Sequence, residues 1–197
     1  ARLLRRHAGA LGWNARFTIF DAEESVREVG RVMEELGIDQ KRWRPKAVKS
    51  VLGDAKNQLI GPERFARENE ESFQLLGRMT AKVYPEYQRS LHRQNAFDFD
   101  DLLMKPVELF EADPQLLARH QERFQFILVD EYQDTNHAQF RLVELLARVH
   151  RNLVVVGDDD QSIYGWRGAD IRNILDFEQT FGGARVVRLE ENYRSTG

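Results

Sequence analysis

The stretch Phe126-Ile127-Leu128-Val129-Asp130-Glu131 decides the fold class of this chain. A short continuous apolar run that ends in carboxylates is typical of a strand buried on both faces of a sheet. A second run, Leu153-Val154-Val155-Val156, follows a helix-like segment at 137–149, and a β-branched stretch at 184–189 follows another at 170–181. This alternation predicts an α/β chain with a buried parallel sheet. Three strands are fewer than a doubly wound sheet needs, so either the domain is very small or its other strands lie outside the chain.

The sequence before this sheet predicts mostly helices. Apolar positions recur at intervals of three and four, which is the spacing of one helical face, with Asp21 as a cap and Gly37 as a stop. The pattern predicts helices at 22–36, 45–60, 65–93, 99–111 and 114–123. Phe73 is expected on the apolar face of the third of these. We therefore divide the chain into a mostly helical region at 1–123 and an α/β region at 124–197.

Composition and charge narrow the classes of function. The chain contains no cysteine, which excludes disulfides, thiolate catalysis, iron-sulfur clusters and zinc sites that need sulfur. No apolar run approaches the roughly 18 residues of a membrane span, so we expect a cytoplasmic protein without a membrane partner. Residues 1–97 carry 18 basic and 13 acidic side chains, whereas 98–197 carry 11 basic and 19 acidic ones. This asymmetry favours polyanionic partners for the first half and cations for the second, although ordinary surface variation explains it equally well.

The residues directly after the apolar runs are the candidate ligand-binding and catalytic residues, because ligands of open parallel sheets bind beyond the carboxyl ends of the strands. Asp130 and Glu131 end the first run in the pattern of a Walker B strand, in which Asp holds Mg²⁺ and Glu polarises the attacking water. The second run ends in Gly157-Asp158-Asp159-Asp160-Gln161. Two carboxylate clusters at one edge repel each other unless a cation lies between them, and Mg²⁺ with a phosphate satisfies both. Strand-end capping is the competing explanation for either cluster alone.

Two large aromatic residues, Tyr164 and Trp166, follow the second acidic cluster and stand next to Arg167. Aromatic faces beside a cation form a platform on which single-stranded nucleic acid stacks. The alternative is that Trp166 fills a hydrophobic gap under the sheet. Its place directly after the acidic strand end favours contact with nucleic acid.

A basic cluster without any acidic residue lies in the helical region, at Lys41, Arg42, Arg44, Lys46 and Lys49. Contact with a phosphate backbone and a solvated start of a helix both account for this pattern. Further along, Asp98 is the expected N-cap of the helix that follows it, and the acids after it favour the helix dipole. Capping explains the aspartates well and explains Phe99, which stands between them, less well.

Three segments resemble motifs of the UvrD/Rep-type superfamily 1 DNA helicases. Residues 127–136 are similar to motif II, 156–169 to motif III and 189–196 to motif IV, in the order and spacing of that family. Residues 98–103 resemble a further family segment, and 1–7 resemble the helix after motif Ib. The resemblance covers the whole chain but only part of such a helicase.

The resemblance implies a helical domain 1B at 1–123 and part of the RecA-like domain 1A, an incomplete P-loop NTPase fold, at 124–197. It implies ATP and Mg²⁺ as cofactors, and as partners single-stranded DNA and junctions between single and double strands, in DNA repair or replication. No GxxxxGK[ST] sequence occurs in the 197 residues, so the Walker A loop that cradles phosphates is missing. We therefore expect an internal fragment of a longer helicase that is inactive as an ATPase alone.

The resemblance also implies roles for single residues. Asp130 would coordinate Mg²⁺ and Glu131 would activate the hydrolytic water. The γ-phosphate would be sensed by Gln161 and contacted by Arg194, and Tyr193 would stack on adenine. Single-stranded DNA would be held by stacking and phosphate contacts from Phe99, Tyr164, Trp166 and Arg167.

Two alternatives to a helicase motor stay open at this point. The parent protein could be a helicase-nuclease of the RecB/AddA type, whose motor motifs are similar. The stretch could also act as a non-catalytic module that binds DNA or protein. A nuclease domain in the parent marks the first alternative, and the absence of a Walker A loop upstream marks the second.

Overall fold

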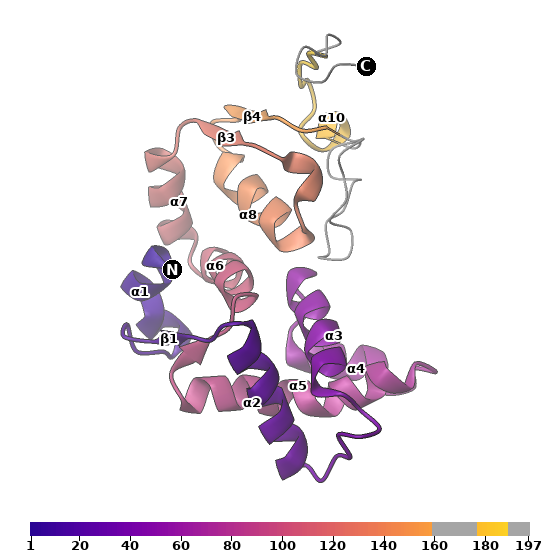
Figure 1. Cartoon of the computed structure of the whole chain (residues 1–197). Helices are drawn as coiled ribbons and strands as arrows, with labels where there is room; N and C mark the ends of the chain where they lie inside the picture. The colour runs from indigo at the N-terminus through magenta and orange to yellow at the C-terminus, as the bar shows by residue number, and fades with distance from the viewer. Residues whose placement is uncertain (159–176, 189–197) are drawn as a thin grey trace, which may run out of the picture.

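The computed structural model describes residues 1–158 and 177–188 (Figure 1). Its first part contains α1 (Arg2–His7), the 3-10 helix η1 (Ala8–Leu11), α2 (Ala22–Glu35), α3 (Pro45–Asn57), α4 (Pro62–Asn69), α5 (Leu75–Arg93), α6 (Asp101–Ala112) and α7 (Pro114–Arg123). Its second part contains β3 (Ile127–Val129), the 3-10 helix η2 (Tyr132–Asp134), α8 (His137–Ala147), β4 (Leu153–Val155) and α10 (Phe177–Thr180). The α/β class is confirmed. In the described ranges, no helix combines the length and the apolar character needed to cross a membrane.

Local signals account for the ends of several helices. The Asp21 side chain accepts a hydrogen bond from the Glu24 amide at 2.8 Å, and the Glu24 carboxylate accepts one from the Asp21 amide at 2.8 Å. This reciprocal capping box starts α2. Gly37 follows the helix with a φ of 66°, a backbone conformation that costs glycine little. The expected start and stop of this helix are confirmed.

The single helix expected at 65–93 is wrong, because the chain breaks between α4 and α5. Phe73, expected to face the core, is completely exposed in this break. The segment 70–74 holds two acidic side chains and one apolar one, so it has little to bury against the core. Local side-chain bonds also compete with the helix here, since the Ser72 hydroxyl accepts a hydrogen bond from the Gln74 amide at 3.1 Å.

The two strands of the second part pair in parallel, as expected. Ile127 lies opposite Leu153, and Val129 lies opposite Val155. Burial on both faces is not observed among the described residues, because the Leu128 side chain is 71% exposed. The strand expected at 184–189 is absent from 184–188, and residue 189 lies outside the described ranges. A β-branched run becomes a strand only by pairing with a neighbour, and the described residues provide none for 184–188.

A second parallel pair, β1 (Thr18–Ile19) with β2 (Ala96–Phe97), is not apparent from the sequence pattern. Its strands come from segments far apart in the chain, and it delivers residues 98–100 to the start of α6. One hydrophobic cluster packs α2, α3 and α5 together. Another joins Val107 and Phe110 of α6 and Leu116 of α7 to Leu145 of α8, so the helices of the first part pack directly on the second.

Candidate nucleotide and DNA site

The carboxylates Asp130 and Glu131 lie at the carboxyl end of β3, and both are exposed. Glu131 has a φ of 50°, which is uncommon for a residue other than glycine and turns the chain sharply into η2. The Tyr132 amide then donates a hydrogen bond to the Val156 carbonyl at 3.0 Å. The turn after β3 is therefore tied to the end of β4, and the two strand ends meet at one edge as expected.

Gln133 joins these two strand ends through its side chain. It is 1% exposed, its amide nitrogen donates to the Glu131 carboxylate at 2.7 Å, and its amide oxygen accepts from the Asp158 backbone amide at 3.1 Å. Both polar ends are used, so the orientation of the amide is defined by its partners. The arrangement fixes the position of the Glu131 carboxylate relative to the end of β4.

The carboxylates at this edge fit a magnesium ion. Mg²⁺ prefers oxygen ligands and binds through one or two carboxylates together with water and substrate phosphates. Asp130 and Glu131 supply such oxygens on the solvent side of the strand end. Within 1–158 and 177–188, no group of three or more His, Cys, Asp or Glu side chains could enclose a metal. A metal held here would draw further ligands from phosphate and water, as is usual for Mg²⁺.

A cavity of ≈ 930 Å³ opens between the two parts of the chain, within the usual size range of ligand sites. Phe99, which is 56% exposed, lies on its wall together with Lys46, Asp100 and Asn136. The wall thus combines an aromatic face with basic, acidic and amide groups. Residues from α3, from the start of α6 and from the segment before α8 all reach it.

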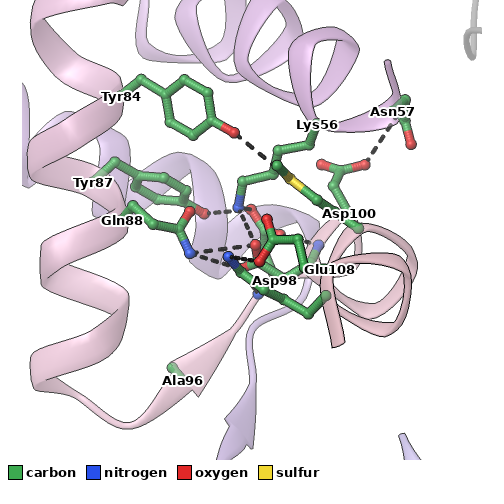
Figure 2. A network of polar contacts seen from close by, with 12 residues as sticks. Lys56, Asn57, Tyr84, Tyr87, Gln88, Ala96, Asp98, Asp100 and Glu108 are labelled. Atoms are coloured by element: carbon green, nitrogen blue, oxygen red, sulfur yellow. Dashed lines mark hydrogen bonds and ion pairs between the residues drawn. The ribbon is translucent and has the colours of Figure 1, made fainter. Parts of the chain in front are cut away.

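Lys56, Asp98 and Asp101 form a buried ionic network next to the cavity residues Asn57 and Asp100 (Figure 2). The Lys56 ammonium lies 2.9 Å from a carboxylate oxygen of Asp98 and 2.8 Å from one of Asp101. All three side chains are at most 1% exposed. The Tyr87 hydroxyl donates to Asp98 at 3.0 Å, and the other Asp98 oxygen accepts from the Asp101 amide at 2.8 Å. Asp98 was the expected N-cap, but α6 begins at Asp101 and its N-cap position is taken by Asp100. The Asp98 carboxylate instead binds the Asp101 amide from two residues further back, because it also serves this network.

The two carboxylates of the network differ in their electrostatics. Burial raises the pKa of Asp98, but the charges of Lys56 and Lys49 outweigh burial and hold that pKa well below its usual range. Burial and the neighbouring Asp98 charge raise the pKa of Asp101 to about 6. Burial also raises the pKa of the Tyr87 phenol, and Asp98 raises it further. Burial lowers the pKa of the Lys56 ammonium, but the charges of Asp101 and Asp98 outweigh burial and raise that pKa.

Residues 1–182 match the family model described as "UvrD/REP helicase N-terminal domain". The chain belongs to this family. It is 45% identical over 195 residues to the ATP-dependent DNA helicase PcrA of Leuconostoc citreum, and 48% and 47% identical to the PcrA proteins of Staphylococcus epidermidis and Staphylococcus aureus. Each match covers 99% of this chain and 26% of the relative. The chain thus spans about a quarter of the length of these relatives, and the resemblance drawn from the motifs is confirmed.

Several residues that the UvrD/REP motifs single out lie outside the described residues. They are Gln161, Tyr164, Trp166 and Arg167 in 159–176, and Tyr193 and Arg194 in 189–197. The UvrD/REP site residues that the structure describes are Asp130 and Glu131 at the end of β3 and Phe99 on the cavity wall. The roles assigned to all of these residues stay predictions.

The basic cluster of this UvrD/REP chain is not uniform. Lys41, Arg42, Arg44 and Lys46 are exposed, but the Lys49 ammonium lies 2.7 Å from Asp100 and 3.5 Å from Asp98, and its side chain is 14% exposed. The acids before α6 therefore neutralise one of the five. Lys49 belongs to the same charge run as its neighbours in the sequence, but only the fold brings it to Asp98 and Asp100.

The sequence also carries a signal that Lys56 is buried and paired. Lys56 follows Val48 and Leu52 at steps of four, on the face of α3 that packs into the core. A lysine at such a position needs a buried carboxylate as partner, because an unpaired charge there is costly. The partners of Lys56 and Asn57 come from distant segments, which periodicity does not reveal.

Proposed function

We propose that this chain is part of an ATP-dependent DNA helicase that couples ATP hydrolysis to movement along a single DNA strand and to separation of duplex. The observation that carries the proposal is the position of Asp130 and Glu131 at the end of β3, joined through Gln133 to the end of β4. The names of the PcrA relatives support the same activity. We also propose a cytoplasmic setting and a role in DNA repair or replication, because duplex separation serves both.

In this proposal different residues of the chain bind the metal, activate the water, contact the nucleotide and hold the DNA. Mg²⁺ held at Asp130 would neutralise charge that develops on the transferred phosphoryl group. Glu131 accepts the proton of the attacking water, with its carboxylate oriented by Gln133. Gln161, Tyr193 and Arg194 contact the nucleotide. The single strand is held by Phe99, Tyr164, Trp166 and Arg167, by stacking and by phosphate contacts.

The test uses the full-length protein that contains this chain. We expect ATP hydrolysis stimulated by single-stranded DNA and unwinding of a forked duplex. The 197-residue chain alone, which lacks a GxxxxGK[ST] sequence, should hydrolyse no ATP. DNA binding by the full-length protein without any ATP turnover would overturn the proposal and favour the non-catalytic binding module, and nuclease activity would favour the RecB/AddA type.

Phe99→Ala should weaken binding of single-stranded DNA by about 1–3 kcal/mol, the usual contribution of one stacking platform. The fold should be unaffected, because the Phe99 side chain is 56% exposed. Fluorescence anisotropy with a labelled oligothymidylate measures the affinity, and thermal unfolding measures the stability. Phe73→Ala is the matched control, since Phe73 is an exposed aromatic away from the cavity. Equal losses of affinity in both variants would contradict a specific role for Phe99.

The exposed members of the basic cluster are expected to contact the DNA backbone near a junction. Replacing Lys41, Arg44 and Lys46 with Ala should flatten the slope of log affinity against log salt by roughly 2–3 on a forked substrate, since each lost phosphate contact releases about one fewer counterion. The control replaces the exposed Arg67, Arg78 and Lys82 of α4 and α5, which removes the same charge elsewhere. Equal slopes for the two triple variants would leave the cluster as a solvated start of α3.

A further inference from the structure

The side chain of Asn57, the last residue of α3, bridges the two parts of the chain. Its amide nitrogen donates to a carboxylate oxygen of Asp100 at 3.3 Å, and its amide oxygen accepts from the Asn136 amide nitrogen at 2.9 Å. In Figure 1 the end of α3 points towards α8, and Figure 2 shows the bond from Asn57 to Asp100. Asp100 can only accept, so the amide of Asn57 has one orientation that satisfies both partners.

On one side, the Asn57 bridge contacts the cavity of ≈ 930 Å³ that Phe99 lines. Asp100 is the neighbour of Phe99 in the chain, and Asn57, Phe99, Asp100 and Asn136 all line the same cavity. The second oxygen of Asp100 lies 2.7 Å from the Lys49 ammonium, so its carboxylate is held from both sides. A base stacked on Phe99 would therefore press on a residue that is bonded to Asn57.

On the other side, the Asn57 bridge contacts Asn136, which is five residues from the proposed catalytic base Glu131. Asn136 is 7% exposed and caps α8, with its side-chain oxygen accepting from the Gln139 amide at 2.9 Å. The segment between Glu131 and Asn136 is bonded to itself, since the Asp134 amide donates to the Glu131 carbonyl at 2.9 Å and the Thr135 hydroxyl donates to the Tyr132 carbonyl at 2.7 Å. A shift of Asn136 is thus carried to Glu131 through a short stretch with little freedom.

We infer that Asn57 is a positioning residue that couples occupancy of the Phe99 cavity by single-stranded DNA to the placement of Glu131. The inference rests on the proposed function of this site. DNA bound in the cavity favours one arrangement of Asp100, and the Asn57 bridge transmits that preference to the start of α8. The coupling is reciprocal for binding, so the state of the nucleotide site also changes the affinity for DNA.

The test measures ATP turnover of the full-length protein without DNA and with saturating oligothymidylate. Asn57→Ala should lower the ratio of turnover with saturating DNA to turnover without DNA by about fivefold or more, which is the range of ordinary allosteric coupling. Saturating DNA separates this role from direct contact, because a lost DNA contact is restored by more DNA. Asn57→Asp, which keeps the shape and removes the donor to Asp100, should give the same loss if the alanine variant folds poorly.

Asn136→Ser completes a double-mutant cycle with Asn57→Ala. Serine retains an oxygen that caps α8 and removes the amide that donates to Asn57. The double variant should lose no more stimulation than either single variant, because both remove the same bond. Asn152→Ala is the control, since the Asn152 amide donates to the Gln125 carbonyl at 3.0 Å at the opposite end of β4. Its stimulation should equal that of the unsubstituted protein.

Three results would overturn the inference. They are unchanged maximal stimulation in the Asn57 and Asn136 variants, stimulation that returns at higher DNA concentration, and additive losses in the double variant. An unsubstituted full-length protein whose ATP hydrolysis does not respond to DNA would instead overturn the proposed function. The failure of the inference and the failure of the function therefore give different results.

Discussion

Lys56→Met lowers the free energy of unfolding of the 197-residue chain by about 3–5 kcal/mol, the usual cost of breaking a buried ion pair by removing one partner. Methionine is close to lysine in length, so the loss comes from charge rather than volume. Asp98 then keeps its buried carboxylate with the Tyr87 hydroxyl and the more distant Lys49 as partners. Urea unfolding followed by circular dichroism measures the change.

Two further substitutions check that charge in the network causes this loss. Lys82→Met, at an exposed lysine of α5, should change the stability by less than about 0.5 kcal/mol. Asp101→Asn should cost less than Lys56→Met, because burial and Asp98 already raise the pKa of Asp101 and so disfavour its charged form. A loss for Lys56→Met no larger than that for Lys82→Met would show that the network contributes little to stability.

Glu131→Gln in the full-length protein lowers ATP turnover by about 10²–10⁴-fold, the usual contribution of a general base. ATP affinity should change little, since the substitution leaves Asp130, the proposed metal ligand, in place. The glutamine can still accept the hydrogen bond from Gln133 through its amide oxygen, so the substitution removes the base without freeing the side chain. Steady-state turnover and nucleotide titration measure the two effects separately.

Glu122→Gln is the control for this substitution. Glu122 is exposed at the end of α7, and its replacement makes the same change of charge away from the end of β3. Turnover should be unaffected. If Glu131→Gln weakened ATP binding as far as it lowered turnover, the assignment of Glu131 as the base would be wrong.

The gap between α4 and α5 and the stretch at 184–188 show where sequence patterns stop being informative. Both stretches contain apolar residues with a plausible spacing, Phe73 in the first and Val186 and Val187 in the second, and all three side chains are exposed. A pattern gives the intrinsic preference of a segment. Whether the segment adopts a helix or strand also depends on a surface or strand edge against which it can pack or pair.

Features set by neighbouring residues could be determined from the sequence alone. The capping box at Asp21, the helix that starts at Pro114, the parallel strands and the carboxylates after β3 each follow from side chains a few residues apart, because caps, turns and strand ends form over that range. The tertiary structure alone decided which distant groups meet. Lys56 and Asp98 are 42 residues apart and Asn57 and Asn136 are 79 apart. Such pairs depend on how helices pack, and the periodicity that places Lys56 on a buried face carries no information about the partner that neutralises it.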